Sequence, residues 1–215
     1  SEAAETARGS DAPLSASAPF AEEFSRALNL FVAGDAAGAK ERLDALAPAV
    51  PRSELWTFFV RAEARIIHHL RGPRAALRSL RSRLAALTDV PPASPFMRRA
   101  LVSRAADLAI CAGELAAARE MLEAELEKND GAILHVSLAR LQLLEGDTAA
   151  AVASVHRGSH CVQGHATSAD FGLLAATIWF AAGDKARAFA ALDEAAPALL
   201  GSTGGTLTAW VPYHP

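Results

Sequence analysis

The chain has 215 residues, of which 51% are hydrophobic and only 6% aromatic, and its net charge is −3 at pH 7. The near balance of charge disfavours a dedicated nucleic-acid-binding surface, and the absence of any run of about 18 apolar residues excludes a membrane-spanning helix. Much of the hydrophobic fraction is alanine, which favours closely packed helices, and the two cysteines are too few for a disulfide framework and suit a reducing cytoplasm.

The sequence begins with residues 1–18, a small and polar stretch that we interpret as a linker or a disordered N-terminal segment. A helical repeat domain is expected over residues 19–200, and residues 201–215 leave the helical pattern as an exit segment. Apolar residues at helical spacing predict ten helices in this domain. The helices form five pairs, at 19–33 with 36–47, 52–71 with 73–88, 95–112 with 115–128, 131–145 with 148–157, and 167–182 with 185–199.

Each pair of helices is divided by a glycine, and these glycines recur every 33 to 41 residues, at Gly34, Gly72, Gly113, Gly146 and Gly183. Glycine adopts the left-handed conformation that ends a helix, and the residue after it can cap the next helix. Asp35, Asp147 and Asp184 are good N-cap residues at these places. Pro73 suits a first helical turn. A spacing in this range is typical of repeated helical hairpins.

The residues around each glycine also repeat. Seven positions before it and five positions after it the side chain is small in most pairs: Ala27, Ala106, Ala139 and Ala176 before, and Ala39, Ala118, Ala151 and Ala188 after. Small side chains there let the two helices of a hairpin approach closely. The second pair departs from the pattern, with Arg65 and Leu77 at these positions. Since a single hairpin cannot bury its apolar face, the pattern predicts an all-α, right-handed superhelix (an α-solenoid) of about five stacked hairpins.

These features resemble the tetratricopeptide repeat family, in which a small residue, a Gly-Asp pair and a later alanine recur in this order, and Pro51 lies where that family often has proline. The stretches LARLQLLEGDTAAAVASV and LLAATIWFAAGDKARAFAALDEA, followed by LTAWVPYHP, are also similar to the helical-repeat region of LuxR-type, MalT-like bacterial transcriptional regulators. That second resemblance implies a non-catalytic region for effector sensing and self-association, between an ATP-binding module and a helix-turn-helix. Neither flanking module is visible in these residues. A free-standing adaptor that holds a peptide is the alternative.

The first resemblance implies that the first helix of each hairpin lines a concave groove. Positions 13, 10, 6 and 3 before each glycine are then expected to face a protein, peptide or small-molecule effector. The candidate partner-binding residues are Phe59, Ile66, His69, Ser103, Asp107, Val136, Arg140, Asp170 and Thr177. The alternative for Asp107 and Arg140 is that they pair with each other across neighbouring repeats. Direct contact with nucleic acid is not expected of this segment.

The segment HRGSHCVQGH contains four potential zinc ligands, His156, His160, Cys161 and His165. The repeat register places the first of them in a helix that ends at Gly158 and the others in the connection that follows. The paired spacing of a structural zinc site is missing. We therefore expect a polar connection between repeats, and neither a metal nor another cofactor.

Four arginines recur along one face of the second helix in the second pair, at Arg71, Arg74, Arg78 and Arg81. Such a stripe suits an acidic partner or a phosphate group, but a solvated helix face is the more economical interpretation. No serine or cysteine lies in a catalytic signature, and the pattern places no carboxylate pair in a pocket. We therefore expect no enzymatic activity.

Overall fold

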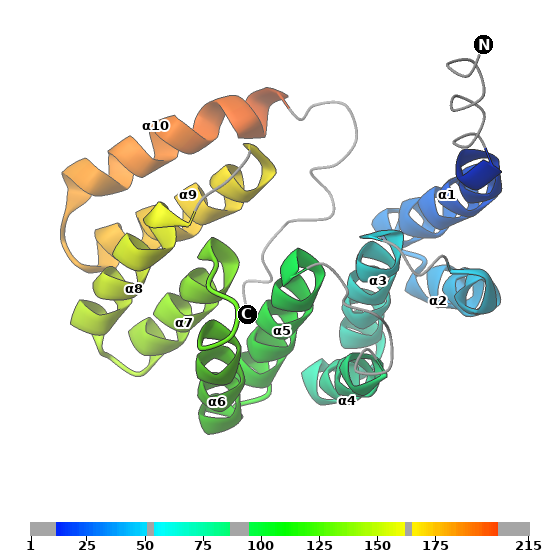
Figure 1. The fold of residues 1–215 in the computed structure, drawn as a ribbon, viewed down its shortest axis with the longest axis horizontal. Helices are drawn as coiled ribbons and strands as arrows, with labels where there is room; N and C mark the ends of the chain where they lie inside the picture. The colour runs from blue at the N-terminus through cyan, green and yellow to red at the C-terminus, as the bar shows by residue number, and fades with distance from the viewer. Residues whose placement is uncertain (1–11, 51–53, 87–94, 162–164, 202–215) are drawn as a thin grey trace, which may run out of the picture. The chain divides into compact units, whose positions relative to one another are not determined.

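Every regular element is helical in the residues that the computed structural model describes, which are 12–50, 54–86, 95–161 and 165–201. The chain divides into two compact units, Ser1–Ala76 (unit 1) and Leu77–Pro215 (unit 2). Unit 1 contains α1 (Ala12–Val32), α2 (Ala36–Leu46), the 3-10 turn η1 (Ala47–Ala49), α3 (Glu54–Arg71) and the start of α4 (Pro73–Ala85). Unit 2 contains the rest of α4 and α5 (Pro95–Cys111), α6 (Leu115–Leu126), α7 (Ala132–Leu144), α8 (Thr148–His160), α9 (His165–Ala181) and α10 (Lys185–Gly201) (Figure 1). The ten predicted α-helices are all present, and none of the described segments is both long and apolar enough to cross a membrane.

The glycine between the helices of each pair ends the first helix, as predicted. All five have φ angles between +78° and +93°, in the left-handed region that glycine tolerates. At Gly146 the amide donates to the Leu143 carbonyl (3.1 Å), and the next amide, that of Asp147, donates to the Gln142 carbonyl (2.9 Å). This pair of bonds is a Schellman motif, which satisfies carbonyls that the helix end would leave unpaired. The same two bonds close every other turn except that at Gly72, where the following proline has no N–H to donate.

The aspartate after the glycine caps the second helix, which confirms another prediction. Asp35, Asp147 and Asp184 each accept a hydrogen bond from the backbone N–H three residues later, at 2.8, 2.9 and 3.0 Å. Each bond satisfies one of the amides that lack an intrahelical partner. Glu114 occupies the same place before α6 and makes no side-chain cap. Three of the five second helices therefore begin with an aspartate side-chain cap.

The small residues around the turns lie in the interior, also as predicted. Those before the glycine are at most 5% exposed and those after it at most 4%: Ala27, Ala106, Ala139 and Ala176, and Ala39, Ala118, Ala151 and Ala188. Larger apolar residues nine positions after the glycine, such as Leu43 and Leu122, are fully buried. Leu192 has the same register in α10 but is 38% exposed, because no described hairpin stacks on that helix.

Arg65 and Leu77, which depart from the small-residue pattern, are both accommodated. Leu77 is 1% exposed. The guanidinium carbon of Arg65, on α3, lies 5.4 Å from the centroid of the Phe31 ring on α1. The ring of His69 meets the same phenyl ring edge-on at 5.6 Å. A cation–π contact thus takes the place of the close alanine contact used elsewhere.

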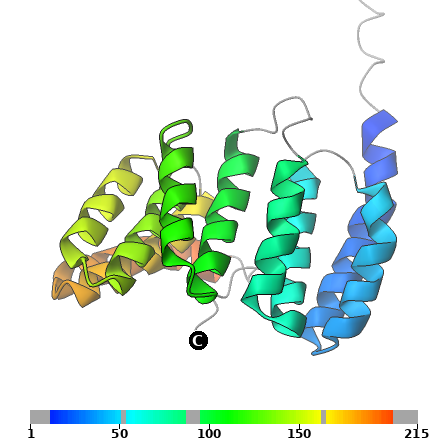
Figure 2. The same ribbon diagram turned by 90° about the horizontal axis from the view of Figure 1, so that it is seen from below.

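In unit 2 the hairpins pack one beside the next, and α7 contacts both α5 and α9 (Figures 1 and 2). One core cluster joins the last two hairpins and consists of Ala139, Ala151, Val155, Ala175, Ile178, Trp179 and Ala188. The Trp179 ring is 8% exposed and meets the His156 ring edge-on at 5.0 Å, while the Arg187 guanidinium lies 4.8 Å from its centroid. One large aromatic side chain therefore connects α8, α9 and α10.

Two predicted boundaries differ from the structure. α1 begins at Ala12, inside the stretch interpreted as a linker, because its alanine and leucine residues favour helix. α8 continues through Gly158 to His160, so the prediction that this glycine ends the helix is wrong. A Cβ atom at Gly158 would lie 2.7 Å from Cε2 of Phe171 and 3.0 Å from Cβ of His135. The glycine is needed there for the close approach of α8 to its neighbours.

Replacing Gly146 by alanine is expected to lower the free energy of unfolding by about 1 kcal/mol, because an L-residue resists the left-handed conformation. The cost is purely conformational, since a Cβ at this position meets no atom within 4 Å. Gly146→Asn is expected to cost less, because asparagine enters this region more readily. Urea denaturation followed by circular dichroism measures both values. Equal stability of all three proteins would contradict this account of the turn.

Replacing Gly158 by alanine is expected to destabilise the protein by about 1–3 kcal/mol, because the added methyl group overpacks the contact with Phe171 and His135. Helix propensity alone predicts the opposite sign, a gain of about 1 kcal/mol. Ala153, exposed on the same helix, provides the control. Ala153→Gly should lose stability through propensity alone, and a gain in stability for Gly158→Ala would show that the glycine is not required by packing.

Candidate partner-binding face

Three of the predicted binding residues have the same register on consecutive first helices of unit 2. Asp107 on α5, Arg140 on α7 and Thr177 on α9 each lie six residues before the glycine of their hairpin. Because α7 packs against both other helices, the shared register predicts that these three positions form a row across one face. The side chains of Asp107 and Arg140 are 24% and 29% exposed, and Thr177 is exposed. We refer to these three residues as the first-helix row.

Asp107 and Arg140 also contact each other. Nη1 of Arg140 lies 3.8 Å from Oδ1 of Asp107, which is the pairing across repeats that the sequence offered as an alternative to binding. The distance is too long for a direct hydrogen bond, and a partly exposed ion pair of this kind contributes about 0–1 kcal/mol. The pairing is therefore compatible with a binding role, because both side chains remain in part exposed to solvent.

A buried serine pair lies beneath the ion pair. The Oγ atoms of Ser103 and Ser137 are 2.8 Å apart, and the two residues are 4% and 3% exposed. The Ser137 hydroxyl also donates to Oδ1 of Asp107 at 3.4 Å. Ser103 was predicted to face a partner, but it supports Asp107 from within. Ser137 was not predicted, because it lies one residue beyond the expected register on α7, where the pattern pointed to Val136.

Three predicted residues lie in the interior, which corrects the expectation that they face a groove. Phe59, Ile66 and Val136 are 1%, 0% and 5% exposed. The Phe59 ring packs against the rings of Phe20 and Phe24 of α1, with centroids 6.3 and 6.1 Å apart. Burial of such a side chain contributes about 1.5–3 kcal/mol, so the apolar residues at these positions serve the core.

Two predicted residues remain, His69 and Asp170. His69 belongs to unit 1, where it is exposed on α3 and contacts Phe31. The side chain of Asp170 lies outside those that the structure describes. Among the predicted residues whose side chains the structure describes, Asp107, Arg140 and Thr177 are therefore the ones in unit 2 that are exposed at least in part.

Exposed apolar side chains lie near the C-terminal ends of two helices of this face. Leu144 on α7 is 58% exposed and Phe180 on α9 is 61% exposed. The position three residues before the glycine is Phe180 on α9, exposed as expected, but on α7 it is Leu143, which packs against the core cluster. The face thus combines charged groups in the middle of its helices with apolar groups near their ends.

Other ion pairs in unit 2 connect helices. Nε of Arg98 lies 2.8 Å from Oε2 of Glu125, a carboxylate that is only 3% exposed and also accepts a hydrogen bond of 2.8 Å from Asn129. Arg119 binds Glu123 and Glu145, and these hydrogen bonds raise the pKa of its guanidinium above the usual value.

Arg81, the last member of the arginine stripe, is paired with Glu114, with Nη2 3.5 Å from Oε2. All four stripe residues are exposed, but the prediction that they line one helix is wrong for Arg71, which is the last residue of α3; Arg74, Arg78 and Arg81 lie on α4.

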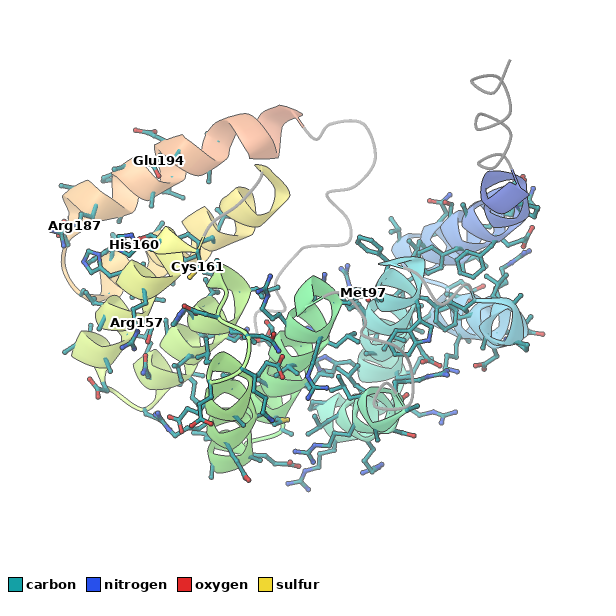
Figure 3. The ribbon with its side chains drawn as sticks, in the orientation of Figure 1. Met97, Arg157, His160, Cys161, Arg187 and Glu194 are labelled. Carbon is teal, nitrogen blue, oxygen red and sulfur yellow. The ribbon has the colours of Figure 1, made fainter. Side chains whose placement is uncertain are left out.

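The described potential zinc ligands of the segment 156–165 do not form a cluster of their own. His156 contacts Trp179, and His160 is exposed at the end of α8 (Figure 3). Cys161 instead lies near Asp130 and His135, and the ligand atoms of these three residues are all within 4.8 Å of one another. The side chain of His165 is outside the described set.

No protein-family model and no curated protein sequence matches the chain. Among solved structures, a repeat protein from Podosopora anserina, named for kinesin light chain and its nearly identical TPR-like repeats, superposes with a TM-score of 0.54 at 17% identity, over 86% of this chain and 97% of that chain. BtubC (BKLC) from P. vanneervenii gives a TM-score of 0.36 at 16% identity, over 94% of this chain and 93% of that chain. The first similarity confirms the predicted tetratricopeptide-like α-solenoid fold, and at this identity it concerns the fold alone.

Removal of Arg98 is expected to destabilise the protein by about 2 kcal/mol or more, because it leaves the buried Glu125 carboxylate without its charged partner. Removal of Arg140 is expected to cost less than about 1 kcal/mol, since its ion pair is long and partly exposed. Denaturation with guanidinium chloride measures the free energy of unfolding of Arg98→Ala, Arg140→Ala and wild type. Similar losses for the two variants would show that Arg140 is as structural as Arg98.

Proposed function

Starting from a tetratricopeptide-like fold, we propose that this chain is a non-catalytic helical repeat that binds a protein or peptide partner on the first helices of unit 2. The observation that carries the proposal is the first-helix row, in which Asp107, Arg140 and Thr177 are partly or fully exposed at one register of adjacent helices. Their positions are fixed by rigid, packed helices, so little ordering is required on binding.

The chemistry of this face suits an extended or helical peptide that carries both charged and apolar side chains. A partner carboxylate can pair with Arg140, and a partner cation or amide can pair with Asp107, in place of the long contact between them. Leu144 and Phe180 offer apolar contact near the ends of the same helices. The Ser137 hydroxyl donates to the Asp107 carboxylate from beneath, and Ser103 is hydrogen-bonded to Ser137.

A binding region of this kind can belong to either of two classes of protein, which the full open reading frame distinguishes. The leading one is the effector- or partner-sensing region of a LuxR-type transcriptional regulator, which is supported by the alanine- and arginine-rich repeats quoted above. In that setting the partner is a protein or small-molecule effector, or a second copy of the region. The alternative is a free-standing adaptor. An upstream ATP-binding module and a downstream helix-turn-helix in the full open reading frame would favour the regulator.

The binding proposal is tested with peptides selected by phage display on the immobilised full chain. Their dissociation constants are then measured by fluorescence polarisation for wild type, Arg140→Ala and Asp107→Ala. Each variant is expected to weaken binding by about tenfold, a loss of about 1.4 kcal/mol, because a charge of the first-helix row is removed.

Arg119 provides a matched control, because it is also a half-buried arginine in an ion pair of unit 2 but lies on α6, the second helix of its hairpin. Arg119→Ala should leave the dissociation constants unchanged. If the selected peptides bind Arg140→Ala and Asp107→Ala as tightly as wild type, the first-helix row is not the binding face.

A further inference from the structure

Three side chains of different chemistry converge in unit 2, away from the first-helix row. Asp130 lies in the connection between α6 and α7, and His135 lies on the first turns of α7. Cys161, labelled in Figure 3, lies at the C-terminal end of α8. Oδ1 of Asp130 is 2.7 Å from Nε2 of His135. One ligand atom from each of the three residues lies within 4.8 Å of the other two. The carboxylate, imidazole and thiol thus share one small volume.

Neighbouring groups contact the Asp130 backbone and the Cys161 thiol, and the Asp130 carboxylate is open to solvent. His135 is 6% exposed, whereas Cys161 is partly buried and the Asp130 side chain is 64% exposed. Arg99 donates a hydrogen bond of 2.7 Å to the Asp130 carbonyl, which fixes the backbone of the connection. The Cys161 thiol lies 3.6 Å from the carbonyl of Arg157. The cluster therefore has a rigid inner part and access from solvent.

The electrostatics distinguish this cluster from an activated nucleophile. Burial, and then the charge of Asp130 and its hydrogen bond, raise the pKa of the Cys161 thiol, while the nearby charge of Arg99 partly offsets this. Partial burial opposes ionisation of Asp130, but the hydrogen bond and charge of His135 outweigh it and lower the pKa of that carboxyl. A reactive cysteine needs a depressed pKa, which Cys161 lacks. A bound divalent cation, in contrast, would remove the thiol proton by direct coordination.

We propose that Asp130, His135 and Cys161 form a binding site for a zinc-type divalent cation, through a carboxylate oxygen, Nε2 and Sγ. This mixed oxygen, nitrogen and sulfur set suits zinc, and three protein ligands leave a fourth position for water. Tetrahedral bonds of about 2.0–2.3 Å place neighbouring ligand atoms about 3.3–3.7 Å apart, so the cluster needs only small side-chain movements to reach this geometry. On binding, the thiol proton passes to solvent. Nε2 of His135, which carries the proton of the hydrogen bond to Asp130, becomes a ligand when the imidazole adopts the tautomer with its proton on Nδ1.

Occupation of the site would connect the start of the fourth hairpin to its end. Asp130 and His135 lie before and within α7, while Cys161 follows α8. A cation held by all three would join the two connections that flank this hairpin, and it would stabilise the folded state by mass action. This inference does not depend on the proposed partner-binding function.

The test uses the full chain without an affinity tag, stripped with a chelator and titrated with Co²⁺ alone. Wild type is expected to bind about one equivalent and to develop the near-ultraviolet charge-transfer absorption of a cobalt–thiolate bond. Cys161→Ser should abolish this absorption, and Asp130→Asn should weaken binding by about tenfold or more. Both residues are partly or largely exposed, so the variants should fold, which far-ultraviolet circular dichroism verifies.

Two matched controls separate this site from other sources of binding. Cys111→Ser removes the other cysteine, and the double variant His156→Ala/His160→Ala removes two histidines of the segment 156–165; both should bind Co²⁺ like wild type. The absence of a cobalt–thiolate band in wild type would overturn the proposal. So would a band that survives Cys161→Ser and is lost in either control. As a second readout, Zn²⁺ should raise the melting temperature of wild type and not that of Cys161→Ser.

Discussion

The close approach of the two helices within each hairpin is the constraint on which the structure depends. Alanine on both sides of the turn permits it, and these alanines are almost completely buried in every hairpin that has them. Such proximity leaves little room for a connection, so the chain reverses through a single left-handed glycine, which a capping aspartate follows in three of the five hairpins. Turn chemistry and small side chains are therefore two requirements of the same geometry.

Alanine contributes little apolar area, so hairpins built in this way depend on larger side chains between them. Trp179 is the clearest example, because it contacts α8 and α10 from its place on α9. Gly158 has the complementary role, since its missing side chain makes room for Phe171 and His135. Where an alanine is replaced by Arg65, an aromatic ring on the adjacent helix receives the guanidinium. Each departure from the repeat pattern thus has a specific partner.

Polar groups also occupy the contacts between helices in unit 2. The Ser103–Ser137 pair joins α5 to α7 of the next hairpin, whereas the Arg98–Glu125 pair joins the two helices of a single hairpin, α5 and α6. Buried groups of this kind must be hydrogen-bonded, so they favour one alignment of the helices over nearby ones. The same alignment brings Asp107 beside Arg140 on the exposed face. The buried polar contacts therefore determine how the side chains of the candidate binding face are arranged.

The sequence by itself determined the helix pairs, the glycine turns, the aspartate caps and the buried alanines, because each depends on local conformation or on a period within one hairpin. Only the tertiary structure decided that Ser137 supports Asp107, that Leu144 is exposed instead of Leu143, and that Cys161 meets Asp130 and His135. These contacts join residues that lie on different hairpins or in separate connections. A small rotation of one hairpin against the next changes which side chains meet, and no local pattern specifies that rotation.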